Sequence, residues 1–238
     1  MFFLLFSFAS FKGLFDLGTS SAFFTFLSKE NQSVRFINIF FSWVLIQFIT
    51  VFLFIAFLIP ENYFNLIWIN EDRFTVILAF VASFMLNSVW TITSQMAEAA
   101  RKTLQVQLVA VSFTALHFLI IILLIFFNKL GIHLILLVIV FEWLFAGILA
   151  FKLYKPDKLK PKQSLSSVLN LYKKFCLPLF PFLILGVIYD FADKWMLQSW
   201  GGSSEQAYFG IALKVSSIAL LATTSLTRIF WKESALLA

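Results

Sequence analysis

The sequence predicts an all-α, polytopic membrane protein with seven transmembrane helices. Apolar residues make up 61% of the 238-residue chain, and the mean hydropathy is +0.93. These residues fall into seven runs, each long enough to cross a hydrocarbon core about 30 Å thick. The segments between the runs alternate between basic and acidic or weakly charged. The long apolar runs exclude a soluble domain.

The spans are predicted to be helices because lipid offers the backbone no hydrogen-bond partners. Strands of a membrane barrel are excluded, since the runs are far longer than a strand of about ten residues and do not alternate with polar residues. We place the helices at residues 2–28, 36–59, 74–98, 104–127, 131–152, 175–198 and 206–230.

The distribution of positive charge predicts the orientation of the spans. Thirteen of the 18 Lys and Arg residues lie in one set of loops, whereas only Arg73 and Lys129 lie in the other. Because basic loops stay in the cytoplasm, the first set is predicted to be cytoplasmic. Residue 1 and the acidic loop 60–73 then lie outside. The net charge of +6 is explained by this topology, so no nucleic-acid partner is expected.

The first run, 2–28, is interrupted by Lys12 and has no basic region before it, so it is not a secretory signal peptide. A chain that starts outside without a signal is expected to lack one upstream span. The abrupt end after the seventh run likewise predicts a fragment of a longer transporter.

The hydrophilic stretch 153–174 follows the fifth run and is predicted to be a cytoplasmic linker between two lobes. Apolar residues recur at helical spacing in its second half, which predicts a short amphipathic helix on the inner membrane surface. A plain cytosolic loop is the alternative. The residues concerned are Leu165, Val168, Leu169 and Tyr172.

The sixth run begins with Pro178 and Pro181, in first turns where a missing N–H group is tolerated. They indicate either a bend at the start of this helix or simply the helix start.

Charged residues inside the spans are the candidates for function. Each costs about 2.5–3.5 kcal/mol near mid-bilayer, so such residues persist where they pair, line a wet cavity or bind a ligand. At 1.5 Å per residue, four of them lie about 12–16 Å from the outer helix ends: Lys12, Glu142, Asp190 and Lys214. Asp16 lies deeper, at about 21 Å.

Helical spacing groups these charges further. Lys12 and Asp16 are four residues apart and share a helix face, as do Asp190 and Lys194. Asp193 and Lys194 lie close enough to the outer end to reach the interface. The whole set predicts a hydrated cavity, whereas a structural ion pair is the alternative for any single pair.

Other reactive groups point to no enzyme, metal site or cofactor. His117 and His133 lie near no Cys, Asp or Glu at metal-ligand spacing and are interpreted as packed or interfacial histidines. Cys176 is the single cysteine, so no intrachain disulfide can form. No glycine-rich phosphate loop or nucleophile elbow is present.

Three segments resemble the polysaccharide-unit flippases of the multidrug/oligosaccharidyl-lipid/polysaccharide exporter superfamily. In that family a proline opens the seventh helix, an acidic–basic pair closes it, and a Tyr…Ala…Lys pattern opens the eighth. The matching residues here are Pro178, Asp193, Lys194, Tyr208, Ala212 and Lys214. Phe15-Asp16-Leu17-Gly18 with Ala22 and Lys29 resembles the second helix, and Glu98-Ala99-Ala100-Arg101-Lys102 is a weaker match.

The resemblance implies helices two to eight of a two-lobed flippase. Residues 1–154 would hold five helices of the N-terminal lobe, whose first helix is missing. Residues 155–174 would form the lysine-rich linker, and residues 175–238 the first two helices of the C-terminal lobe.

The resemblance also implies a function. The family moves an undecaprenyl-diphosphate-linked oligosaccharide across the bacterial cytoplasmic membrane by alternating access, for O-antigen and other polysaccharide biosynthesis. Lys12, Lys214 and Lys194 would bind the diphosphate. The acids Asp16, Glu142, Asp190 and Asp193 would pair with them or exchange a coupling ion, H⁺ or Na⁺. Expected partners are membrane lipid, a polysaccharide polymerase and glycosyltransferases.

Two other functional classes remain open at this point. One is a cation-coupled multidrug exporter of the same superfamily, since the balance of lysines and acids does not decide between the cargoes. The other is a membrane scaffold that transports nothing, or the remnant of a split gene. A scaffold predicts that the embedded charges are all paired and dry.

Overall fold

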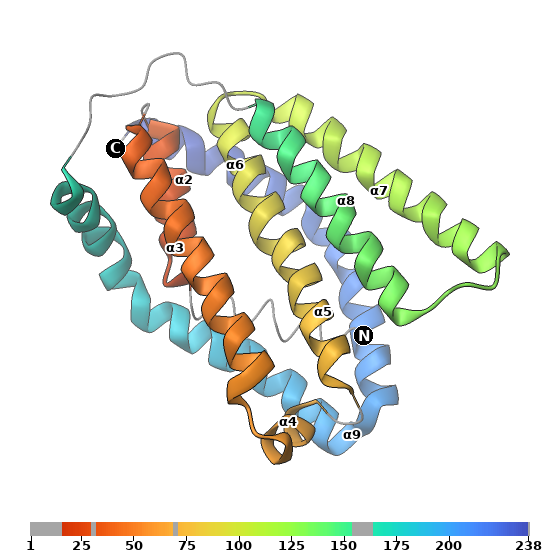
Figure 1. Ribbon diagram of the computed structural model, residues 1–238. Coiled ribbons are helices and arrows are strands. Elements are labelled where there is room, and N and C mark those ends of the chain that lie inside the picture. Colours follow the sequence, from red (N-terminus) through yellow and green to blue (C-terminus); the bar gives the residue numbers. More distant parts are fainter. Residues whose placement is uncertain (1–15, 30–31, 69–70, 154–163, 238) are drawn as a thin grey trace.

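The computed structural model describes residues 16–29, 32–68, 71–153 and 164–237, and the elements in these ranges are all helical (Figure 1). The stretches η1 and η2 are π-helical, and each continues the helix before it. The elements are α2 (Thr19–Lys29), α3 (Val34–Leu53), η1 (Phe54–Leu58), α4 (Glu61–Ile67), α5 (Arg73–Phe84), η2 (Met85–Trp90), α6 (Thr91–Ala99), α7 (Thr103–Phe126), α8 (Ile132–Leu153) and α9 (Leu165–Leu237).

Five of the described helices are long and apolar enough to cross a membrane, which confirms the helical membrane class. They are Val34–Leu58, Arg73–Ala99, Thr103–Phe126, Ile132–Leu153 and Leu165–Gly186. The first four match predicted spans, with ends that differ by one or two residues. The other three predicted spans differ from the structure in ways described below.

The outer surface of the bundle suits lipid contact. On α7, Val106 is the one fully buried residue, while Leu108, Val111 and Phe118 are each more than half exposed. A helix that is apolar all round needs either a protein core or lipid around it. Because α7 lies at the edge of the bundle in Figure 1, lipid is the expected neighbour.

The predicted helix 2–28 is not continuous. Leu17 and Gly18 both have positive φ angles, 50° and 77°, so the chain leaves the helical conformation before α2 begins. Glycine tolerates this conformation because it has no Cβ. A Cβ at Gly18 would also lie 3.2 Å from Leu183 of α9, so the break sits against that helix.

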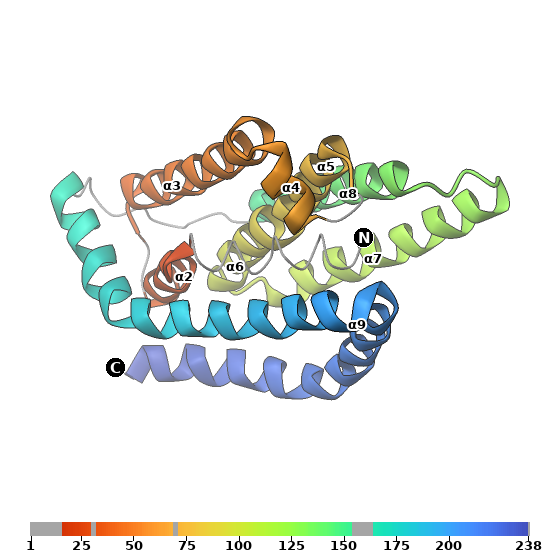
Figure 2. The same ribbon diagram turned by 90° about the horizontal axis from the view of Figure 1, so that it is seen from below.

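The predicted amphipathic helix and the predicted spans 175–198 and 206–230 form one helical element, α9, broken at Gly202 (φ 77°, ψ −178°). The chain reverses direction in the blue part of α9 (Figure 2). The expected outer loop is therefore replaced by a tight break that glycine permits.

The sequence predicts Pro178 and Pro181 in the first turns of a helix, but the structure has both prolines inside α9. The helix starts earlier because Ser164 caps it, with its Oγ accepting from the Ser167 N–H at 3.1 Å. A proline inside a helix removes a backbone hydrogen bond and kinks it. Figure 2 shows α9 bent where its colour changes from teal to cyan.

Two apolar clusters hold the bundle together. In the first, Ile55, Phe64 and Val76 pack with Leu136 of α8. In the second, α2, α3 and α9 meet through aromatic rings. Phe23 stacks on Phe40 with ring centroids 4.0 Å apart, and Phe36 stacks on Tyr172 at 5.0 Å.

The amphipathic segment therefore lies against α3. Its residues Val168 and Tyr172 are buried, at 0% and 8% exposure.

Arg73 closes the end of the span Val34–Leu58. Its guanidinium donates to the carbonyl oxygens of Ile55 (2.8 Å), Ala56 (3.2 Å) and Ile59 (2.9 Å). It also pairs with Glu61 at 2.9 Å and lies over the Phe64 ring at 4.8 Å. Carbonyl groups at a helix end lack helical partners, so this side chain satisfies them and fixes α5 to the end of η1.

The η2 stretch packs closely against α8 at Gly147, where the absence of a side chain leaves room for it. A Cβ on Gly147 would lie only 2.9 Å from Val89 Cγ1. Because valine is stiff at χ1, it cannot turn away easily.

We predict that Gly147→Ala lowers the stability of the protein in detergent by about 1–3 kcal/mol, the usual cost of overpacking. Gly186→Ala is the matched control, because a Cβ there meets nothing within 4 Å. Thermal unfolding followed by tryptophan fluorescence gives the comparison. Equal melting temperatures for the two variants would contradict the close approach of η2 and α8.

Candidate functional site

The helices α7 and α8 form an antiparallel pair joined by a short turn (Figure 1). His117 on α7 lies 12 residues before Lys129 in this turn, and Glu142 on α8 lies 13 residues after it. Residues at equal distances from such a turn lie at the same depth. Glu142 is ten residues from the start of α8 at Ile132, or about 15 Å. That is half of a hydrocarbon core about 30 Å thick.

His117 and Glu142 form an ionisable pair at this depth. The His117 Nδ1 and Glu142 Oε2 atoms are 2.6 Å apart. The Glu142 side chain is 6% exposed, and that of His117 is 33% exposed. The second carboxyl oxygen, Glu142 Oε1, is buried and has no hydrogen-bond partner. A buried acid with one oxygen free is rarely kept for packing alone.

This pair can hold one exchangeable proton. With that proton the pair is neutral overall, either as carboxylic acid and imidazole or as carboxylate and imidazolium. Without it a net negative charge stays inside the membrane, which is unfavourable unless water reaches the carboxylate. The arrangement can therefore carry a proton in a closed state and release it where an aqueous path opens.

Sequence reasoning selected Glu142 but missed its partner. Along the chain, His117 has no acid at a spacing that would indicate a pair, so the sequence alone indicates a packed or interfacial histidine. Its position relative to the α7–α8 turn is the signal that could have found the contact.

Asp16 occupies the break before α2. Its carboxylate accepts from the Ser20 Oγ at 2.7 Å, the Thr19 Oγ1 at 3.0 Å and the Ser20 N–H at 3.2 Å. These donors belong to the first turn of α2, whose N–H groups have no helical partners. The carboxylate thus caps a helix. The helix face predicted to carry both Lys12 and Asp16 lies outside the described residues, which begin at Asp16.

Of the other predicted site residues, Lys12 lies outside the described residues. Asp190, Lys194 and Lys214 lie on α9, and their side chains are outside the described part of the structure. Asp193 is exposed and lines a shallow pocket of about 380 Å³ beside the break in α9, with Trp200 and Gly201. Glu142 contacts His117, whereas the Asp16 carboxylate is bound by Thr19 and Ser20, so these two predicted site residues have different partners.

A second network lies at the bundle end that carries α4. The Thr75 hydroxyl contacts both the Asp72 carboxylate and, at 2.7 Å, the His133 Nε2. Because a carboxylate only accepts, the hydroxyl donates to Asp72 and accepts from His133. The Thr75 N–H donates to Asp72 as well, at 2.9 Å. These hydrogen bonds from Thr75 lower the pKa of Asp72 below 3.8.

No group of three or more His, Cys, Asp or Glu within the described ranges could hold a metal ion. Cys176 is a free thiol on α9.

Comparison of the chain with protein-family models, with curated proteins and with solved structures yields no match. The resemblance to polysaccharide-unit flippases therefore stays a prediction from the residues quoted above. The chain's own geometry supplies the further argument.

A double-mutant cycle tests the His117–Glu142 contact. We expect His117→Ala and Glu142→Ala to be non-additive, with an interaction free energy of about 0.5–3 kcal/mol. Each single change leaves one polar partner in the membrane, whereas the double change removes both. Unfolding of the purified variants in detergent measures the cycle. The pair His133 and Glu142 serves as the control and should be additive, and additivity at His117 would disprove the contact.

The Asp72 cap predicts a pH dependence. Because the folded pKa is lowered, Asp72 stabilises the fold above the unfolded pKa and this contribution is lost as the pH falls through the folded value. Asp72→Ala should cost about 0.5–2 kcal/mol at pH 7. Its deficit relative to the wild type should shrink below about pH 4. Melting temperatures from pH 7 to pH 3 test this, with Glu71→Gln as the control, and a deficit independent of pH would contradict it.

Proposed function

We propose that this chain is a proton-coupled secondary transporter, with the His117–Glu142 pair as its proton-carrying site. The observation that carries the proposal is the buried carboxylate at mid-membrane depth, held at 2.6 Å by a histidine and left with one oxygen free. Ionisable side chains inside a membrane are expensive, and they usually mark proton relays or substrate pathways.

The pair is placed where a helix movement would change its exposure. It joins α7, whose surface is mostly exposed, to α8, which packs into the bundle against α5, η2 and α6. A shift of α7 relative to α8 would separate the two side chains and admit water to the carboxylate. Proton release would then be linked to a change of conformation, as alternating access requires.

For the cargo, we propose the lipid-linked oligosaccharide that the flippase resemblance implies. The support is the residue pattern of Pro178, Asp193 and Lys194, with Lys214 further along α9. Lysines inside a membrane can neutralise a diphosphate on its way across. Lys12, Lys194 and Lys214 remain the proposed diphosphate contacts.

The predicted orientation, with residue 1 outside and residues 153–174 in the cytoplasm, has support from the bundle. The C-terminal ends of α2, α6 and α8 lie at the same end of the bundle (Figure 1). Lys29 and Lys152 lie in the last turns of α2 and α8, and Arg101 follows α6. The α7–α8 turn, with Lys129, lies at the other end. We propose the bacterial cytoplasmic membrane as the location, with the basic end inside.

A membrane scaffold is the second candidate. It is favoured by the close pairing of Glu142 with His117, since a scaffold needs its embedded charges paired. A scaffold and a transporter differ in what happens when the proton is removed from the pair.

The test is transport by the full chain in proteoliposomes, with an undecaprenyl-diphosphate-linked oligosaccharide. A membrane-impermeant glycosidase reports how much glycan reaches the outside. We expect a pH gradient to speed transport by the wild type. Glu142→Gln and His117→Gln should abolish this dependence and slow transport about tenfold or more, within the usual range of coupling between sites.

Glu205→Gln and His133→Gln are the controls, because they change an exposed acid and an exposed histidine and should leave transport unchanged. Gradient-dependent transport by Glu142→Gln at the wild-type rate would disprove the proton site. A wild-type chain that moves no glycan under any gradient would favour the scaffold, and movement of a cationic dye instead would favour multidrug export.

A further inference from the structure

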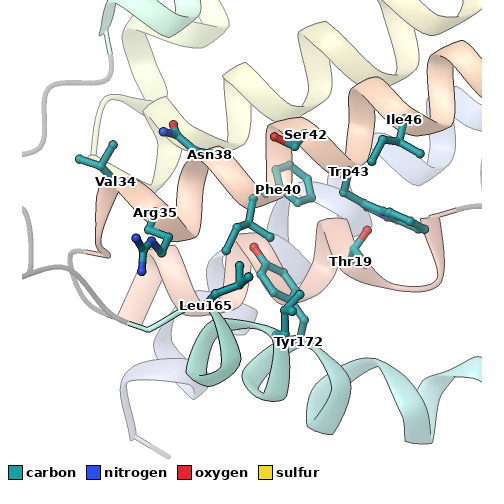
Figure 3. A pocket seen from close by; sticks show the side chains of 12 residues that line it. Thr19, Val34, Arg35, Asn38, Phe40, Ser42, Trp43, Ile46, Leu165 and Tyr172 are labelled. Carbon is teal, nitrogen blue, oxygen red and sulfur yellow. The ribbon is translucent and has the colours of Figure 1, made fainter.

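A pocket of about 660 Å³ lies between α3 and the first part of α9, with Thr19 of α2 at its side (Figure 3). Its volume falls within the range of about 300–1,000 Å³ that is typical of small-molecule sites. It is separate from the His117–Glu142 pair, which involves α7 and α8. The walls are mostly apolar, with Val34, Ile39, Phe40, Ile46, Leu165 and Leu169.

The pocket follows α3 for a considerable length. Its lining runs from Val34 to Ile46, which are 12 residues, or about 18 Å, apart along the helix axis. Arg35 lies at the end of the pocket that coincides with the start of α3. The first turn of a spanning helix lies at the level of the lipid headgroups. The pocket thus has a cationic end at the membrane surface and an apolar interior.

Two polar groups in the interior have no partner. The Tyr172 hydroxyl and the Trp43 Nε1 are buried and make no hydrogen bond. Tyr172 is only 8% exposed, and its hydroxyl points from α9 towards α3 (Figure 3). An unpaired buried polar group costs free energy comparable to a lost hydrogen bond, so a native structure normally supplies a partner.

We propose that this pocket binds one chain of an anionic glycerophospholipid. The phosphate lies at Arg35, ester oxygens accept one hydrogen bond from Tyr172 and another from Trp43, and the acyl chain fills the apolar part towards Ile46. Both hydrogen-bonding atoms are covered by protein in the structure, so side chains of the pocket wall have to shift when the ester enters.

The pocket has a cation at its end and unpaired hydrogen-bond donors further inside, and this order favours a diacyl lipid over a polyprenyl carrier. Tryptophan Nε1 can only donate, and the tyrosine hydroxyl can donate, so both require an acceptor oxygen inside the pocket. A glycerophospholipid has ester oxygens between its phosphate and its acyl chain, whereas a polyprenyl phosphate has only hydrocarbon beyond the phosphate. This site is independent of the proposed transport, because none of its residues belongs to the proton-carrying pair.

Native mass spectrometry of the full chain in detergent tests the proposal. The protein is titrated with dioleoyl phosphatidylglycerol, dioleoyl phosphatidylcholine and undecaprenyl phosphate. We expect phosphatidylglycerol to bind most tightly. Tyr172→Phe, which removes only the hydroxyl, should raise its Kd about fivefold, as expected for the loss of one hydrogen bond.

Arg35→Gln should raise the Kd for phosphatidylglycerol about fivefold or more and reduce its advantage over phosphatidylcholine. Tyr189→Phe and Arg101→Gln are the matched controls, since both residues are exposed and lie outside the pocket, and they should bind phosphatidylglycerol like the wild type. Unchanged binding in both Tyr172→Phe and Arg35→Gln would overturn the proposal. So would tighter binding of undecaprenyl phosphate that responds equally to Tyr172→Phe.

Discussion

Inside lipid, every backbone N–H and C=O group must find its partner within the protein, and this constraint decides what the charged residues of the chain do. At the end of η1, the Arg73 guanidinium donates to the carbonyl oxygens of Ile55 and Ile59. At the break before α2, the Asp16 carboxylate accepts from the first turn of the helix. Both charges therefore complete helices, and the fold would leave polar backbone groups unsatisfied without them.

Hydropathy predicted the four spans from α3 to α8 to within two residues, because the length of each apolar run in the sequence determines the length of the span. It did not predict the break at Leu17 and Gly18, since the apolar run continues through it. The partner of Glu142 was missed for another reason. Depth follows from the distance to the α7–α8 turn, but which faces meet depends on the rotation of each helix, and a uniformly apolar α7 gives no sign of its rotation.

The two candidate sites lie on different sides of the molecule. The His117–Glu142 pair belongs to the α7–α8 hairpin, while the pocket lies between α3 and α9, and the span from α5 to α6 lies between these parts in Figure 1. The first site can change its charge, and the second offers apolar walls with one cation at the membrane surface. Under the two proposals above, a proton acts on one hairpin while membrane lipid binds the helices on the opposite side.

The π-helical stretch η2 changes the phase of the helix that contains it. Buried positions step by five residues from Ser83 to Ser88, and then by four to Ile92 and by four to Met96. A π-turn is equivalent to one residue inserted into an α-helix. The two halves of this span therefore present faces rotated by about 100° from what an unbroken helix would give. A homologue one residue shorter in this stretch could keep both faces by straightening into a regular helix, so a single-residue gap is expected here when sequences are aligned.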